Sequence, residues 1–159
     1  MTRTYVITGS ASGIGQATVE KLKSLGNTVI GVDIHNADVV ADLSTPQGRI
    51  DAAKKAIELS HDSIDAVIAC AGLAHPTATT VSVNYFGVTE FLNELLPTLT
   101  KSKTPRVVIT SSVASIMPNS TELVEAMCAN DEAKAVEIAQ ALVDAAAGGE
   151  QLIYGSTKR

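Results

Sequence analysis

Residues Thr8–Gly15 read TGSASGIG and join a short β-rich run, Tyr5–Thr8, to a segment of helical periodicity that ends near Gly26. A strand, a glycine-rich turn and a helix in this order suit a pyrophosphate, because glycines permit a sharp turn, close approach of the backbone to an anion and tight helix packing. Free amides at the start of the helix attract negative charge. The apolar stripe expected on this helix consists of Ile14, Thr18, Leu22 and Leu25.

A second apolar run, residues 28–32, ends at Asp33, which stands 24 positions after Gly9. An acid at about this distance accepts hydrogen bonds from the ribose hydroxyls of a dinucleotide. Because a carboxylate repels a 2′-phosphate and the turn has no Arg or Lys to balance one, we expect NAD rather than NADP as the cofactor. The alternative, a glycine turn that merely joins strand to helix, leaves Asp33 unexplained.

Strand-like and helix-like segments alternate further along the chain. Residues 66–69 and 106–110 predict two more strands, and helices are expected between them. Continuous apolar strands that alternate with helices are typical of a parallel sheet covered on both faces. We therefore expect an α/β fold, a doubly wound parallel sheet of Rossmann-like type, in a single domain over residues 1–159. One helix is expected to begin at Ser44 or Thr45 and to bury Ile50, Ala53 and Ile57, and another to bury Val81, Tyr85, Val88, Leu92, Leu95 and Leu99.

Residues 121–147 are rich in alanine and in acidic side chains, and they predict a helical insertion of one broken or two short helices. Residues 121–150 contain seven acidic residues and one lysine, a charge of −6, so the rest of the chain is nearly neutral and the net charge of −5 arises here. The expected apolar positions of the insertion are Leu123, Ala126, Ala133, Val136, Ala139, Leu142 and Val143.

Composition excludes several classes of function. An acidic chain with 3% aromatic residues has neither a phosphate-neutralising patch nor a stacking platform, so we expect no nucleic-acid partner. Residues 66–89 form the longest stretch without Asp, Glu, Lys or Arg, but polar residues interrupt it and exclude a membrane span. The residues after Arg3 become polar too early for a secretory signal, which favours a cytoplasmic protein. Cys70 and Cys128 suit neither a disulfide framework nor a metal site, and we expect no metal.

Tyr154 and Lys158 stand four residues apart near the end of the chain, on one face of a helix expected to begin near Leu152. A phenol normally titrates near 10, and a neighbouring ammonium favours the phenolate. With the complete Thr-Gly-x-x-x-Gly-x-Gly pattern at Thr8–Gly15, this pair makes the chain resemble the N-terminal portion of a short-chain dehydrogenase/reductase. The 42 positions between Ser112 and Tyr154 leave room for the insertion, and with several local motifs they resemble the bacterial 3α-hydroxysteroid dehydrogenase/carbonyl reductase branch.

The resemblance implies a catalytic set of Ser112, Tyr154, Lys158 and Asn84. Tyr154 would exchange a proton with the substrate oxygen, Ser112 would position that oxygen, Lys158 would favour the phenolate and hold the nicotinamide ribose, and Asn84 would anchor a water. Ser111 stays an alternative to Ser112, and a purely structural role at a helix kink stays an alternative for Asn84. The resemblance also implies that the Asp42–Leu43 pair stands beside the adenine. The implied NAD-binding residues are Thr8, Gly9, Ser12, Gly13, Ile14, Gly15, Asp33, Asp42, Leu43, Cys70, Ala71, Gly72, Tyr154 and Lys158.

Cys70 stands where the family has asparagine, so the hydrogen bonds of that asparagine side chain are not expected here. The implied function is an NAD(H)-dependent oxidoreductase that interconverts a secondary alcohol and a ketone, with a steroid among the candidate substrates. The family's length implies a C-terminally truncated fragment with little activity by itself, and a homo-oligomer at full length.

Three alternatives stay open. The chain could be a non-catalytic NAD-binding module for sensing or assembly, or a related dehydrogenase of aromatic alcohols. The insertion could also serve as an oligomer contact; that contact would use Leu123, Val136, Leu142 and Val143.

Overall fold

The computed structural model describes residues 2–145 and 148–159, which form two compact units. The first unit combines the residues up to Ala71 with Val88–Thr110, and the second combines Gly72–Gly87 with Ser111–Arg159. Residues 146–147, at the end of the expected insertion, lie outside the described residues. That residues 1–159 form a single domain stays a prediction.

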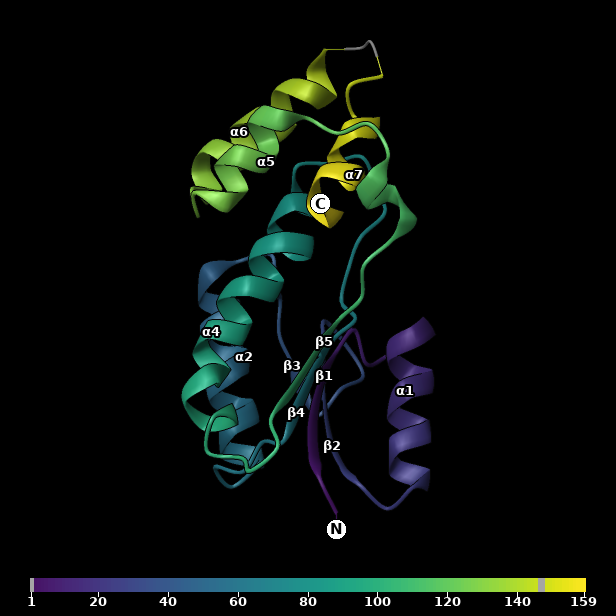
Figure 1. The fold of residues 1–159 in the computed structure, drawn as a ribbon, viewed down its shortest axis with the longest axis vertical. Coiled ribbons are helices and arrows are strands. Elements are labelled where there is room, and N and C mark those ends of the chain that lie inside the picture. The colour runs from purple at the N-terminus through teal and green to yellow at the C-terminus, as the bar shows by residue number, and fades with distance from the viewer. Residues whose placement is uncertain (1, 146–147) are drawn as a thin grey trace. The chain divides into compact units, whose positions relative to one another are not determined.

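The first unit contains a five-stranded, fully parallel sheet with the strand order β3-β2-β1-β4-β5. Helix α1 (Gly13–Ser24) covers one face, and α2 (Pro46–Leu59) and α4 (Gly87–Leu99) cover the other (Figure 1). This arrangement confirms the predicted doubly wound α/β fold. The strands are β1 (Thr4–Thr8), β2 (Thr28–Asp33), β3 (Val39–Val40), β4 (Ala66–Ala69) and β5 (Arg106–Ile109).

The order of the strands reverses next to β1. From β1 the chain proceeds outward to β2 and β3, then returns to the other side of β1 for β4 and β5. Such a switch point leaves a crevice at the carboxyl ends of the two diverging strands, and ligands of open α/β sheets bind there. Here these ends are Thr8 of β1 and Ala69 of β4, which are register partners.

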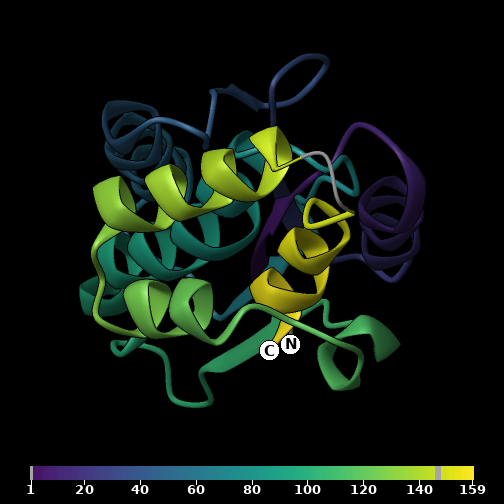
Figure 2. The same cartoon turned by 90° about the horizontal axis from the view of Figure 1, so that it is seen from above.

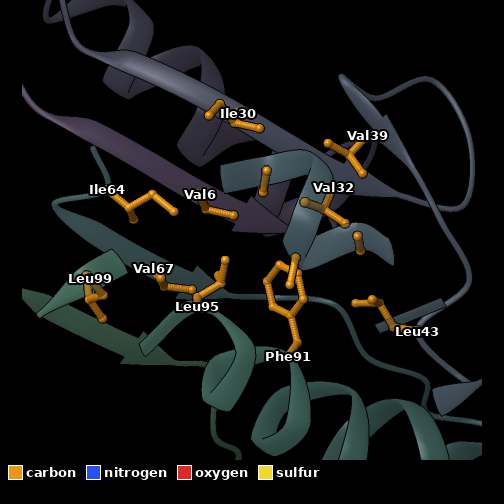
Figure 3. Packing of buried hydrophobic residues seen from close by; sticks show 13 residues of the cluster. Val6, Ile30, Val32, Val39, Leu43, Ile64, Val67, Phe91, Leu95 and Leu99 are labelled. Atoms are coloured by element: carbon orange, nitrogen blue, oxygen red, sulfur yellow. The ribbon is translucent and has the colours of Figure 1, made fainter. Parts of the chain in front are cut away.

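The core of the first unit lies between the sheet and helices α2 and α4 (Figure 3). Val6, Val67 and Leu95 are completely buried in it, and Phe91 nearly so. Helix α2 begins as predicted, with Thr45 as its N-cap and Pro46 as its first residue. Its predicted buried face is wrong in part, because Ile50 and Ile57 are only half-buried. The buried positions of α2 are instead Arg49, Ala52, Ala53 and Ala56. The three alanines are small and let the helix approach the sheet closely.

Two expectations about burial in this unit are wrong. Strand β5 is an edge strand paired with β4 alone, and the exposed fractions of Val107, Val108 and Ile109 are 45%, 54% and 54%. Apolar composition identified the strand, but it did not indicate that the strand lies at the edge of the sheet or that its side chains are exposed. In α1, Ile14 and Leu25 are 67% and 62% exposed, and the buried residue of this helix is Gly15 instead.

The second unit is helical. Helices α5 and α6 run alongside each other with α7 next to them (Figure 2), around a core that includes Phe86 and Ile153. Two separate helices therefore occupy most of the expected insertion. The elements are α3 (Thr79–Val81), the π-helical turn η1 (Ser82–Phe86), the 3-10 turn η2 (Val113–Ile116), α5 (Thr121–Cys128), α6 (Glu132–Asp144) and α7 (Gln151–Lys158).

Capping side chains explain why the insertion divides into two helices. Ser120 accepts a hydrogen bond from the Leu123 amide at the start of α5, and Asp131 accepts one from the Lys134 amide at the start of α6. One expected apolar position is wrong: Ala133 is exposed, since the phase of α6 directs Ala135 inward instead. Leu123 is completely buried, as its place in the apolar stripe predicts, and its side chain is therefore not exposed for the alternative oligomer contact.

None of the helices in the described ranges combines the length and the apolar character that crossing a bilayer requires.

Asp65, just before β4, ties three segments of the first unit together. Its carboxylate accepts hydrogen bonds from the Thr4 amide at 3.0 Å and from the Ser102 hydroxyl at 2.6 Å. The Ser102 hydrogen bond above all, then the Thr4 amide, lower the pKa of Asp65. Burial raises this pKa and Arg3 lowers it, with a net lowering.

We expect Asp65→Asn to lower the free energy of unfolding at neutral pH by about 1 to 2 kcal/mol. Because the folded-state pKa of Asp65 is depressed, its stabilisation is present above the carboxyl's unfolded-state pKa and is lost as pH falls through the folded-state pKa. Urea unfolding at pH 7 and at acidic pH should therefore show the two proteins converging in acid. Asp62→Asn is the matched control, since Asp62 is exposed and its carboxylate has long contacts of 3.4 Å with Lys101 and with the Thr98 hydroxyl. A pH-independent difference would contradict this account.

Candidate functional site

The glycine turn lies between β1 and α1 at the switch point of the sheet. Gly9 has a φ of +68°, and a Cβ there would lie 2.7 Å from the Ala71 nitrogen. The Ala71 amide also donates to Thr8 Oγ1 at 3.1 Å. A Cβ on Gly15 would overlap the Gly9 carbonyl oxygen. Glycine is therefore required at Gly9 for the turn to pack against the chain that follows β4, and at Gly15 for the start of α1 to pack against the turn.

Gly13 differs from these two glycines because open space adjoins it. Its φ is +53°, and no heavy atom lies within 4 Å of the position of a Cβ. Ser12, the N-cap residue, makes no capping hydrogen bond with its side chain, and Ile14 in the first turn is exposed. The first amides of this 12-residue helix therefore meet open space and fit a dinucleotide pyrophosphate.

Asp33 at the end of β2 is held beside the glycine turn. Its Oδ2 accepts from the Ala11 amide at 2.9 Å, and its Oδ1 accepts from the Ile34 amide at 2.7 Å. The Ser10 amide donates to the Val32 carbonyl at 3.3 Å, which adds a second link between turn and strand. A carboxylate fixed next to a pyrophosphate cradle is well placed to accept from ribose hydroxyls.

The Asp42–Leu43 pair follows β3, whose residue Val40 is in register with Asp33. The Ala41 amide donates to the Asp33 carbonyl at 2.9 Å, so both acids stand at the same edge of the sheet. The Asp42 side chain is exposed, whereas Leu43 is buried in the core.

Cys70 takes the position where the resemblance implies asparagine. Its sulfur accepts from the Thr110 hydroxyl at 3.3 Å, which links the ends of β4 and β5. The Cys70 side chain is half-buried. It thus replaces the hydrogen bonds of an amide side chain with one weak sulfur contact.

In the second unit, Tyr154 and Lys158 lie on one face of α7, as their spacing predicts. The Lys158 ammonium nitrogen is 5.7 Å from the centroid of the Tyr154 ring. Gly155 lets α7 approach the preceding segment, because a Cβ there would lie 3.0 Å from the Pro118 carbonyl oxygen and 3.2 Å from that of Ala114. Close packing therefore fixes the helix that carries the phenol and the amine.

Ser112 is fixed more firmly than Ser111. It is the N-cap of η2, and its hydroxyl oxygen accepts from the Ala114 amide at 3.2 Å. Ser112 is half-buried while Ser111 is exposed. The Ala114 carbonyl oxygen lies next to Gly155 of α7, so the turn that Ser112 caps packs against that helix. The choice of Ser112 over Ser111 as the site hydroxyl stays a prediction.

Asn84 lies in the π-helical turn and is 6% exposed. Its Oδ1 accepts from the Leu73 amide at 2.7 Å, and its Nδ2 donates to the Leu73 carbonyl at 2.9 Å and to Thr157 Oγ1 at 3.1 Å. Thr157 in turn donates to the Tyr154 carbonyl at 2.9 Å. The Asn84 side chain thus links α7 to the loop after β4. The alternative predicted from the sequence, a structural role at a helix kink, did not include this link.

Gly72 completes this cluster. A Cβ on Gly72 would lie 3.3 Å from Asn84 Oδ1 and 3.8 Å from the Lys158 ammonium nitrogen. The structure therefore brings Gly72, Asn84 and Lys158 together, although they are far apart in the sequence. Sequence reasoning missed Thr157; its position between Tyr154 and Lys158, on the inner side of a short helix, was the only available signal.

A family model described as short chain dehydrogenase matches residues 3–126. The chain belongs to the short-chain dehydrogenase family. It is 40% identical over 158 residues to the 3-alpha-hydroxysteroid dehydrogenase/carbonyl reductase of Comamonas testosteroni, a match that covers 96% of this chain and 60% of the relative. It is also 40% identical over 95 residues to a coniferyl-alcohol dehydrogenase of a Pseudomonas strain, which covers 56% of this chain and 36% of that relative.

Among solved structures, the 3-alpha-hydroxysteroid dehydrogenase of Pseudomonas sp. B-0831 complexed with NADH matches with a TM-score of 0.89 and 41% identity. This match covers 98% of the present chain and 61% of that protein. The short-chain dehydrogenase chain described here thus spans about 60% of the length of its relative from Comamonas.

We expect Asn84→Ala to lower the free energy of unfolding by about 1 to 3 kcal/mol, because the Leu73 amide and carbonyl and the Thr157 hydroxyl all lose a hydrogen-bond partner. Thermal and urea unfolding followed by circular dichroism measure the effect. Asn93→Ala, at an exposed position of α4, is the matched control and should change stability little. Equal stability of the two variants would show that the Asn84 link contributes nothing.

Proposed function

We propose that the protein is an NAD(H)-dependent oxidoreductase that interconverts a secondary alcohol and a ketone. The observation that carries this proposal is the Tyr154–Lys158 pair, held on α7 by the Asn84 cluster, in a chain of the short-chain dehydrogenase family. A phenol next to a cation suits proton exchange with an alcohol oxygen, because the phenol oxygen can hold or release a proton at the reacting atom.

Each residue then has a defined task. The Tyr154 side chain takes the proton of the alcohol hydroxyl as a phenolate during oxidation, and as a phenol it gives that proton to the carbonyl oxygen during reduction. The Ser112 hydroxyl donates a hydrogen bond to that oxygen and orients it. Lys158 lies beside the phenol and binds ribose hydroxyls, and Asn84 anchors a water that relays protons. Bound NAD supplies the hydride acceptor.

NAD is proposed over NADP on the position of Asp33. Its carboxylate is fixed by the Ala11 amide, so it cannot easily turn away from a 2′-phosphate, and residues 8–16 contain no Arg or Lys. Like charges then repel, and the uncharged 2′-hydroxyl is preferred. The relative solved with NADH supports the same choice.

Steroid secondary alcohols are the proposed substrate class, supported by the names of the relatives from Comamonas and Pseudomonas sp. B-0831. An aromatic alcohol is the second candidate, because the match to a coniferyl-alcohol dehydrogenase favours it. Cytoplasmic location and assembly into a homo-oligomer stay predictions.

Substitution of Gly13 tests the cofactor site. Gly13→Ala places a methyl group in the open space at the start of α1, and we expect it to weaken NADH binding about tenfold or more in a fluorescence titration. Gly26→Ala is a matched control, because Gly26 also has a positive φ, +79°, and no heavy atom within 4 Å of a Cβ. Both variants carry a similar backbone strain, so equal loss of binding in both would contradict the assignment.

Substitution of Tyr154 tests catalysis. We expect Tyr154→Phe to lower kcat for secondary-alcohol oxidation by the full-length protein about 100-fold or more, because the proton acceptor is lost. NADH affinity should stay within about twofold, since no phosphate contact changes. Tyr85→Phe is the matched control: burial, followed by the influence of Cys128, raises the pKa of Tyr85, so its phenol is not expected to act as a base. Undiminished turnover by Tyr154→Phe would favour a non-catalytic NAD-binding module.

A further inference from the structure

Arg49 on α2 is the largest completely buried side chain of the chain's described part. Burial of a guanidinium is costly unless the charge is paired and its N–H groups are bonded. The countercharge is Glu90 of α4, whose Oε2 is 2.8 Å from Arg49 Nη1 and whose side chain is 31% exposed. A well-packed apolar side chain would fill the same space at less cost, so the remaining bonds of Arg49 need an explanation.

Two further hydrogen bonds of the Arg49 guanidinium hold one turn of the chain. Arg49 Nε donates to the Leu43 carbonyl at 2.8 Å, and Nη2 donates to the Ser44 carbonyl at 3.2 Å. Both carbonyls belong to the turn between β3 and α2. The guanidinium therefore fixes the backbone of this turn through two consecutive peptide groups.

Two further contacts restrict the same turn. The Thr45 hydroxyl donates to the Asp42 carbonyl at 3.2 Å and accepts from the Gly48 amide at 3.1 Å. At Gly48 a Cβ would overlap the Asp42 carbonyl oxygen. The Asp42 carbonyl is thus bonded to the Thr45 hydroxyl and packs directly against Gly48, although the Asp42 side chain itself is exposed.

The exposed carboxylate of Asp42 is the group that this framework presents. Its Oδ1 accepts from the Ser44 amide at 2.8 Å, so the anchored turn also orients the carboxylate. Through Ala41, Asp42 stands at the same sheet edge as Asp33, the proposed ribose ligand. A carboxylate beside the ribose site can accept from an exocyclic amine of the base, as acidic side chains accept from base amines in nucleic acids.

The family resemblance implies that the Asp42–Leu43 pair stands beside the adenine. We propose that Arg49 is a positioning residue, which holds this turn so that the Asp42 carboxylate can accept a hydrogen bond from the adenine amine. This inference rests on the proposed NAD(H) site and concerns how that site selects the base. Arg49 contacts no part of the dinucleotide in this account. It acts through the carbonyls of Leu43 and Ser44.

Base selectivity distinguishes this role from a merely structural one. The probes are NADH and reduced nicotinamide hypoxanthine dinucleotide, which has a carbonyl in place of the amine. We expect the wild-type chain to bind NADH about tenfold more tightly, because the carbonyl faces the carboxylate without a proton to share. Arg49→Lys and Arg49→Met should reduce this preference to about threefold or less, as should Asp42→Asn.

Lys54→Met is the matched control, because Lys54 is an exposed cation on the same helix. It should keep the full preference of the wild-type chain. Variants of Arg49 that unfold at lower temperature but keep the wild-type preference would overturn the inference. If both Arg49 variants fail to fold, Glu90→Gln takes their place: it removes the countercharge that holds Arg49, and an unchanged preference in this variant would equally overturn the inference.

The failure of the proposed function gives a different result. In that case the wild-type chain binds neither dinucleotide. Binding of NADH without preference over the hypoxanthine analogue would leave the NAD site standing and overturn the role of Asp42, and with it the role of Arg49.

Discussion

The parallel pairing of β1 with β2 on one side and β4 on the other is the constraint on which the rest of the first unit depends. It places the carboxyl ends of three strands at one edge, so that Gly9, Asp33 and Ala71 become neighbours although the sequence separates them. The hydrogen bond from the Ala11 amide to Asp33 and the one from the Ala71 amide to Thr8 then fix the glycine turn between two strands. The proposed phosphate-binding amides and the proposed ribose-binding carboxylate are placed by this pairing.

The second unit relies on a buried amide instead of a sheet. Asn84 satisfies both backbone groups of Leu73 and also donates to Thr157, which is bonded to the backbone at Tyr154. A fully bonded polar cluster of this kind is rigid, since every displaced partner loses a hydrogen bond in a poorly solvated place. The phenol and the amine of α7 are therefore held by a support that lies outside α7.

Much of the fold could be predicted from the sequence because its signals are local. The run before Gly9, the distance to Asp33 and the spacing of Tyr154 and Lys158 each depend on neighbouring residues, and the corresponding elements appear where they were expected. Capping residues such as Thr45 are equally local. The signals that place a ligand site at the carboxyl edge of the sheet were thus present in the primary structure.

The parts that could not be predicted depend on contacts between distant residues. Helical periodicity assigned Ile50 to the buried face of α2, but long-range bonds to Glu90 and to the turn after β3 draw Arg49 inward. Composition likewise identified β5 without indicating that its valines are exposed at the edge. For Asn84, the sequence suggested a functional helix position, while its bonds to Leu73 and Thr157 arise only in the folded unit.

The central claim is that Asp33, held against the glycine turn, makes this chain a site for NAD rather than NADP. The ratio of the dissociation constants for NADH and NADPH, measured by titrating the chain with each, tests it most directly. We predict that NADH binds more tightly by about tenfold or more, because the Asp33 carboxylate accepts from a ribose hydroxyl and repels a phosphate. Equal or tighter binding of NADPH would contradict the account.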